Sequence, residues 1–279
     1  STLPPLPVDQ SDRNRTSPFA FTGNKFEFRA VGSSQSIAPV NIALNAAVAC
    51  ALDDIATELE NTTAQGVSLN DALQTLLPRL FKEHAPIIFN GNGYTAEWPK
   101  EAEKRGLPNY ANTVDALLHY TDADVMEVFK RHNILNEREM LSRQEILLEN
   151  YANTICIEGT VLLGMLQTKV LPPARKTEKE AAEALLAVQK IASASTATEE
   201  AFFTTVQNHI HELEKGVQEL RKALEHTKTA TQGSGQAIAA RDTILPAMQH
   251  CRTHADALEE LIDDALWQLP KYAEMLWIH

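Results

Sequence analysis

The sequence has few cysteines and few positive charges for its length. Three cysteines occur among 279 residues, and no C-x-x-C pair could hold zinc or a redox disulfide. We interpret Cys50, Cys156 and Cys251 as small apolar residues in a reducing cytoplasm. Lys and Arg number 25 against 37 Asp and Glu, and the formal charge of -12 repels phosphate backbones. The composition predicts a cytoplasmic protein that does not bind nucleic acid.

Long apolar runs are also absent. The most apolar stretch near mid-chain, residues 161–166, lies between Glu158 and Lys169 and is far shorter than the ~20 residues of a membrane span. We therefore expect no contact with a membrane. Residues 1–7 contain no initiating Met and no signal-peptide pattern, so we expect the protein to continue upstream.

The N-terminal part has the alternation of a β-strand pair. Phenylalanines occur at every second position on both sides of residues 22–24, which predicts a β-hairpin within residues 13–31. Residues 42–59 are apolar nearly all round, so we expect a helix that is buried on most sides. Glycines and prolines then divide residues 61–134 into short helices, with one candidate strand at 86–89.

The C-terminal half has helical periodicity. We predict long helices at 137–171, at 177–226 with a possible break near 193–195, and at 236–268, joined by a glycine-containing turn at 231–235. One apolar stripe, with alternating spacings of four and three, predicts a coiled-coil-like seam. It consists of Val206, Ile210, Leu213, Val217, Leu220 and Leu224. The chain is therefore predicted to be mainly α, with a short N-terminal hairpin followed by an antiparallel helical bundle.

Charged residues gather on the predicted hairpin. Residues at i, i+2 and i+4 of a strand share a face, so Lys25, Glu27 and Arg29 are expected on one side, and Arg13 and Arg15 share a face of the partner strand. Four cations around one carboxylate suit phosphoryl transfer, which needs fixed positive charge and a metal ligand. A salt-bridge ladder on a solvated face accounts for the same pattern equally well.

The same segment resembles a known family. An Asn-Arg-Thr at 14–16, a Lys-Phe-Glu-Phe-Arg at 25–29, and a helix opening near Asn41 are similar to the glutamine synthetase pattern. The run 13–29 is most similar to the type III class, as are residues 87–94 and the final residues 277–279. The resemblance covers essentially the whole chain.

The resemblance implies roles for the charged residues. Arg15 would contact the transferring phosphate, Lys25 the nucleotide phosphates beside Arg13, and Arg29 the substrate carboxylate or its phosphate. Glu27 would bind Mg²⁺ or Mn²⁺. Lys25 departs from the family's usual Arg, and a further family Arg is missing near Phe19 and Ala20.

The resemblance also implies an activity and an architecture. The reaction would be the ATP-dependent amidation of glutamate by ammonia through γ-glutamyl phosphate. Residues 1–60 would complete an α+β catalytic domain, 61–134 would form a connecting layer, and 135–279 would form a class-specific bundle and tail. Because the remaining active-site residues would lie upstream, we expect the chain alone to be inactive, and the parent enzyme to be a ring-shaped homo-oligomer.

Other interpretations of the function remain open. The principal alternative is a non-enzymatic helical interaction or assembly module, and an ATP-binding regulatory protein is a third, although the chain has no nucleotide loop. His250 and His254 have the i, i+4 spacing of metal ligands, but the sequence indicates no third ligand. We interpret residues 209–212 as helix surface, because Lys215 stands where a second metal-binding His would be.

Overall fold

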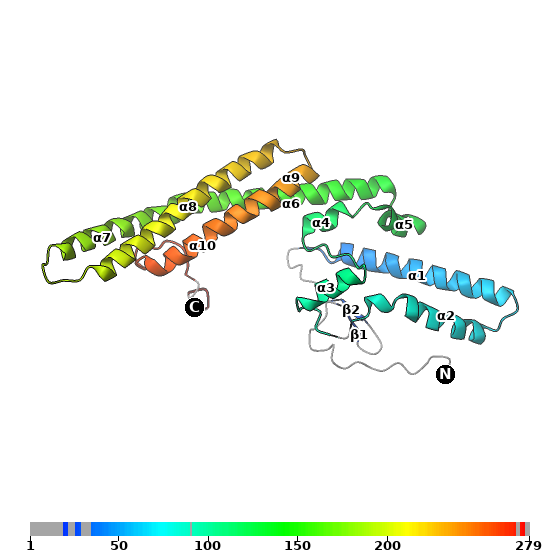
Figure 1. The fold of residues 1–279 in the computed structure, drawn as a ribbon. Helices are drawn as coiled ribbons and strands as arrows, with labels where there is room; N and C mark the ends of the chain where they lie inside the picture. Colours follow the sequence, from blue (N-terminus) through cyan, green and yellow to red (C-terminus); the bar gives the residue numbers. More distant parts are fainter. Residues whose placement is uncertain (1–18, 22–25, 29–34, 90, 272–273, 277–279) are drawn as a thin grey trace. The chain divides into compact units, whose positions relative to one another are not determined.

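The computed structural model describes residues 19–21, 26–28, 35–89, 91–271 and 274–276, and these are mostly helical (Figure 1). The chain divides into two compact units, Ser1–Met140 and Leu141–His279. Each unit is described by itself below. The predicted division into 1–60, 61–134 and 135–279 stays a prediction.

The first unit contains two short strands and a set of mostly short helices. β1 pairs antiparallel with β2, with Ala20 opposite Glu27, and the rest of the predicted hairpin lies outside the described residues. A small core forms around Ala46, Phe129 and Met140. The elements are β1 (Phe19–Phe21), β2 (Phe26–Phe28), α1 (Ala38–Ala64), α2 (Leu69–Glu83), η2 (Ala85–Ile87), α3 (Glu97–Lys104), α4 (Thr113–Leu118) and α5 (Ala123–Arg131).

Helix α1 is much more exposed than the sequence predicts. Only Ala46 and Cys50 are buried, whereas the side chains of Val48 and Leu52 are 55% and 60% exposed. The expectation of a helix buried on most sides is therefore wrong for the described part of this chain. The reason is that α2, α5 and Met140 of α6 cover only parts of α1, and among the described residues nothing buries Val48 or Leu52.

The predicted strand at 86–89 is also wrong. Ala85–Ile87 form a single 3-10 turn, and Phe89 stacks on Trp98 with ring centroids 4.3 Å apart. The guanidinium of Arg105 donates hydrogen bonds to the carbonyl oxygens of Pro86 and Ile88 at 3.1 and 2.8 Å. Because a side chain binds these carbonyls, they are not available to a neighbouring strand.

The second unit is an antiparallel helical bundle. Figure 1 shows α6 continuing into α7, α8 running back, and α10 running forward again. The helix ends at Gln189 and restarts at Ala197, which agrees with the possible break near 193–195. The elements are α6 (Glu137–Met165), η3 (Leu166–Val170), α7 (Leu171–Gln189), α8 (Ala197–Thr229), α9 (Ser234–Ala239), η4 (Ala240–Ile244), α10 (Leu245–Leu261) and η5 (Glu274–Leu276).

Two π-helical turns interrupt the long helices. The predicted break between 171 and 177 does not occur, because the turn η3 lets the helix continue through Pro172 and Pro173. The N–H of Leu171 donates to the carbonyl of Leu166, five residues back. The wider turn relieves the clash that a proline makes with the carbonyl four residues earlier. The turn η4 precedes Pro246 in the same way.

The apolar seam of the bundle is confirmed. All six predicted stripe residues are buried, and Val206, Leu213 and Leu220 are 0% exposed. They form one core with residues of η3, α7, η4 and α10. The seam therefore holds α8 between the preceding and the following helix.

Two helices are long and apolar enough to cross a membrane by length and composition, Ala38–Ala64 and the continuous helix Glu137–Gln189. Core helices of soluble proteins meet the same criterion. The absence of a membrane contact stays a prediction.

Candidate functional site

The predicted phosphate and metal residues lie almost entirely outside the described part of the chain. Arg13, Arg15, Lys25 and Arg29 fall there. Glu27 lies at the centre of β2, paired with Ala20 across the two-stranded sheet. The structure therefore describes the backbone of the strand that contains the predicted metal ligand. The grouping of the five charged residues stays a prediction.

Several arginines of the described helices already pair with two carboxylates each. Arg79 pairs with Glu58 and Glu83, joining α2 to α1. Arg131 pairs with Asp53 and Asp54, joining α5 to α1. In the second unit Arg175 likewise pairs with Glu178 and Glu214. These guanidinium groups hold helices together and are poor candidates for binding phosphate.

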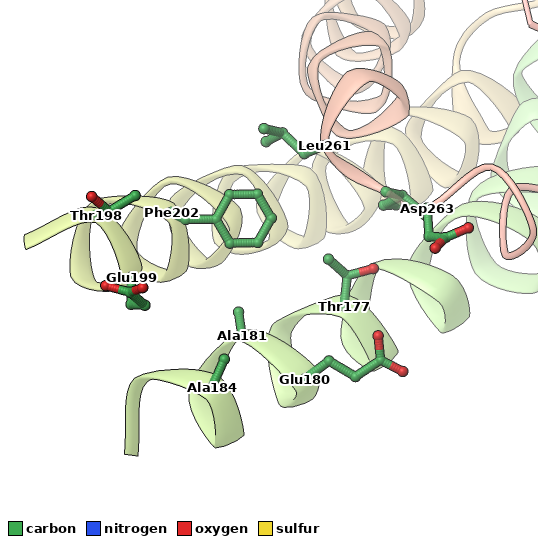
Figure 2. A pocket seen from close by; sticks show the side chains of 10 residues that line it. Thr177, Glu180, Ala181, Ala184, Thr198, Glu199, Phe202, Leu261 and Asp263 are labelled. Carbon is green, nitrogen blue, oxygen red and sulfur yellow. The ribbon is translucent and has the colours of Figure 1, made fainter. Parts of the chain in front are cut away.

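The second unit contains a pocket of about 550 Å³ at one end of the bundle (Figure 2). Its walls come from α7, α8, the last residue of α10 and the chain just after it. The oxygens Thr177 Oγ1 and Glu199 Oε2 are buried without a hydrogen-bond partner among the described residues. The lining residues are Thr177, Glu180, Ala181, Ala184, Thr198, Glu199, Phe202, Leu261, Ile262 and Asp263.

This pocket is chemically unsuited to a nucleotide. Three of its lining residues, Glu180, Glu199 and Asp263, carry carboxyl groups, and none of the described lining residues is a Lys or Arg. Carboxylates repel phosphate oxygens, and no cation is present to offset that repulsion. The phosphate chemistry expected from the sequence therefore does not belong to this pocket.

The cysteines offer no nucleophile among the described residues. All three are free, and Cys50 and Cys251 are buried. Burial, together with the nearby Glu219 carboxylate, raises the pKa of Cys251 to about 11, so this side chain is a neutral thiol at pH 7. Burial also raises the pKa of Cys156. Their interpretation as small apolar residues is confirmed for Cys50 and Cys251.

A group of potential metal ligands forms around the histidine pair for which the sequence indicated no third ligand. Glu212 of α8 and both His250 and His254 of α10 lie together, with ligand atoms all within 4.8 Å of one another. His209 touches the same group. The sequence contained a signal that was missed. His209 and Glu212 have i, i+3 spacing on α8, His250 and His254 have i, i+4 spacing on α10, and these two helices were already predicted to pack antiparallel.

Comparison with known proteins gives a consistent result. Residues 72–189 match the glutamine synthetase C-terminal domain family. The chain is 34% identical over 280 residues to a glutamine synthetase of Bacteroides fragilis (strain YCH46) and 34% identical over 285 residues to a type-3 glutamine synthetase of Dictyostelium discoideum. A glutamine synthetase of Butyrivibrio fibrisolvens is 32% identical over 275 residues.

These alignments cover almost all of this chain but a minor part of its relatives. They include 99% of the chain for the first two proteins and 96% for the third. The chain spans 38% of the length of each relative. The similarity therefore extends from the hairpin to the bundle, beyond the segment 72–189.

Proposed function

The chain is related to glutamine synthetases along 99% of its own length, and from this premise we propose that it is part of a glutamate–ammonia ligase. The reaction joins ammonia to the γ-carboxylate of glutamate and converts ATP to ADP and phosphate. The observation that supports the proposal is the extent of the similarity, which includes the charged hairpin as well as the helical part. Within the parent enzyme the hairpin would form one wall of the active site.

The proposed chemistry has two steps. A γ-carboxylate oxygen of glutamate attacks the γ-phosphorus of ATP, the bond to ADP breaks, and γ-glutamyl phosphate forms. Ammonia then attacks the carbonyl carbon, the bond to phosphate breaks, and glutamine forms after loss of a proton. Both steps gather negative charge on phosphate oxygens, which fixed cations stabilise.

The residues of the hairpin supply groups for this chemistry. Arg15 would stabilise the phosphoryl group in transfer, and Lys25 and Arg13 the nucleotide phosphates. Arg29 would bind the substrate carboxylate, for which a planar guanidinium with two parallel donors is well suited. The positive charges would orient both substrates and lower the repulsion between them.

Glu27 fits one ligand position of Mg²⁺ or Mn²⁺. Such hard cations take oxygen ligands and are commonly held by one or two carboxylates together with substrate phosphates. The ion would neutralise negative charge on the phosphates when bound. One carboxylate in β2 is a partial site, so the other protein ligands would come from outside this chain.

The assembly and the location of the parent enzyme are also part of the proposal. The uncovered apolar surface of α1, and exposed residues of α6 such as Ile157 and Val161 at 64% and 56%, support burial against further protein. We place the rest of the catalytic domain over α1. A cytoplasmic homo-oligomer would bury the exposed apolar residues of α6. The mass of the full-length enzyme in solution would test whether it forms such an oligomer.

The test of the function is Glu27→Gln in the full-length enzyme. Because an amide is a far weaker ligand than a carboxylate for a hard cation, formation of γ-glutamyl phosphate should fall at least 10-fold at ordinary magnesium. Glu225→Gln, at an exposed carboxylate on α8, is the matched control and should be unaffected. Normal glutamine synthesis by Glu27→Gln would refute the assigned role.

A further inference from the structure

Three potential ligands from two helices converge in the second unit. Glu212 lies on α8, and His250 and His254 lie one turn apart on α10. The Oε2 atom of Glu212 is 3.4 Å from Nε2 of His250, and the ligand atoms of all three residues lie within 4.8 Å of one another. All three side chains are half-buried, so the group is partly dry and still reachable from solvent.

A glycine accounts for the close approach of the two helices here. A Cβ atom at Gly216, one turn after Glu212, would lie 2.9 Å from Cys251 Sγ and 3.5 Å from His250 Nδ1. Only a residue without a side chain fits this spacing. The contact fixes the register of α8 against α10 and thereby places the histidines opposite Glu212.

Hydrogen bonds orient the first imidazole. The Oε2 atom of Glu219 is 3.0 Å from Nδ1 of His250. A neutral His250 that donates its Nδ1–H to this carboxylate keeps its lone pair on Nε2, the nitrogen that faces Glu212. Metal-binding histidines commonly donate their other N–H to a carboxylate in this way.

A hydrogen bond to His209 also orients the imidazole of His254. Nδ1 of His209 is 3.1 Å from Nδ1 of His254, so one of these nitrogens donates a hydrogen bond to the other. Burial, followed by the neighbouring His250 and His209, lowers the pKa of His254. A lowered pKa favours the neutral form of the ring, in which an imidazole binds a metal.

We propose that Glu212, His250 and His254 form a binding site for a divalent transition metal of the zinc type. Two imidazole nitrogens and one carboxylate are a known ligand set for zinc, with a fourth position left for water. Mg²⁺ would bind poorly, since it prefers oxygen ligands. The ion would join α8 to α10, and His209 and Glu219 would act as positioning residues.

This inference is independent of the proposed function, because the site is built from bundle residues alone. The full chain, freed of metal by a chelator, would be titrated with zinc chloride and the heat of binding measured. We expect one zinc ion per chain and a higher melting temperature with zinc than without it. Cobalt chloride should bind at the same site and give the visible absorption of a tetrahedral ion.

Variants locate the site. Affinity for zinc should fall at least 10-fold in His250→Gln, His254→Gln and Glu212→Gln, and less in Glu219→Gln. His211→Gln is the matched control, since His211 is an exposed histidine of α8 next to Glu212 and outside the ligand group. It should bind zinc as the wild type does. If a histidine variant fails to fold by circular dichroism, Glu212→Gln decides the matter.

Two results would overturn the proposal. One is the absence of stoichiometric binding at a molar excess of zinc. The other is equal affinity in the wild type and in folded variants of Glu212, His250 and His254. In either case the contacts of His250 with Glu212 and Glu219 would be hydrogen bonds between the two helices, without a metal.

Discussion

Two glycines of the bundle unit differ sharply in their surroundings. A Cβ at Gly216 would meet Cys251 Sγ at 2.9 Å, whereas a Cβ at Gly164 would have no neighbour within 4 Å among the described residues. We predict that Gly216→Ala lowers the free energy of unfolding by about 1–3 kcal/mol, because α8 and α10 must separate. Gly164→Ala should raise it by up to about 1 kcal/mol through helix propensity. Urea unfolding of both variants checks this, and equal effects would contradict it.

At Thr177, by contrast, we expect a substitution to stabilise the protein. It is 7% exposed, and its Oγ1 has no hydrogen-bond partner among the described residues. Because a buried hydroxyl without a partner carries a desolvation penalty, we predict that Thr177→Val raises the free energy of unfolding by about 1 kcal/mol. Thr198→Val, at an exposed position of the same pocket, is the control and should change stability little. A destabilised Thr177→Val would show that the hydroxyl is paired, for example with water.

The ligand group shows why single residues are hard to assign from sequence. The spacing of His250 and His254 was visible, but the third ligand was not. Glu212 is 38 positions before His250 and meets it only because Gly216 sets the register of two antiparallel helices. A side-chain group of this kind depends on contacts that no local pattern encodes.

At the scale of elements, the seam of α8 gives the clearest prediction. Leu213 is 0% exposed at the centre of the stripe. An unpaired carboxylate there should lower the free energy of unfolding of Leu213→Asp by at least about 3 kcal/mol. Gln218→Asp, on the exposed side of α8, introduces the same charge and should have a small effect. Thermal denaturation compares them, and normal melting of Leu213→Asp would mean that the stripe is not a buried seam.

The confirmed helix α8 and the failed strand at 86–89 show which sequence patterns predict structure reliably. The spacing of four and three in α8 was sufficient because one repeated apolar stripe outweighs local detail over a helix of 33 residues. The strand predicted at 86–89 failed because a distant side chain, Arg105, binds its carbonyls. For short segments such a tertiary contact outweighs β propensity.

At the scale of the whole molecule, the two compact units imply separate cores. Among the residues that the structure describes, the main apolar core consists of residues between 151 and 269. We therefore predict that a truncated chain of residues 137–279, starting where α6 begins, folds into a helical protein with a single cooperative unfolding transition. Circular dichroism on heating checks this. A broad, non-cooperative loss of helicity would show that the bundle needs residues 1–136.

The first unit limits what this sequence could predict about the candidate active site. The apolar pattern of α1 correctly indicated a helix, but burial depends on what packs around it, and the described elements cover α1 only in part. The charged hairpin was predicted from its residue types and from family resemblance, and it stays a prediction. In the proposed enzyme the other active-site residues would lie outside this chain, so the sequence of the chain cannot predict how they assemble with the hairpin.

The two π turns have a consequence for comparing chains of different length. Each turn closes over five residues where an α-helix closes over four, so it behaves as one residue inserted into an otherwise continuous helix. Each insertion makes room for the prolines that follow it, at 172 and 173 or at 246. The inserted residue and the proline should therefore be gained and lost together. A relative without Pro246 should show a one-residue gap within residues 240–244, and its buried positions on both sides should still align.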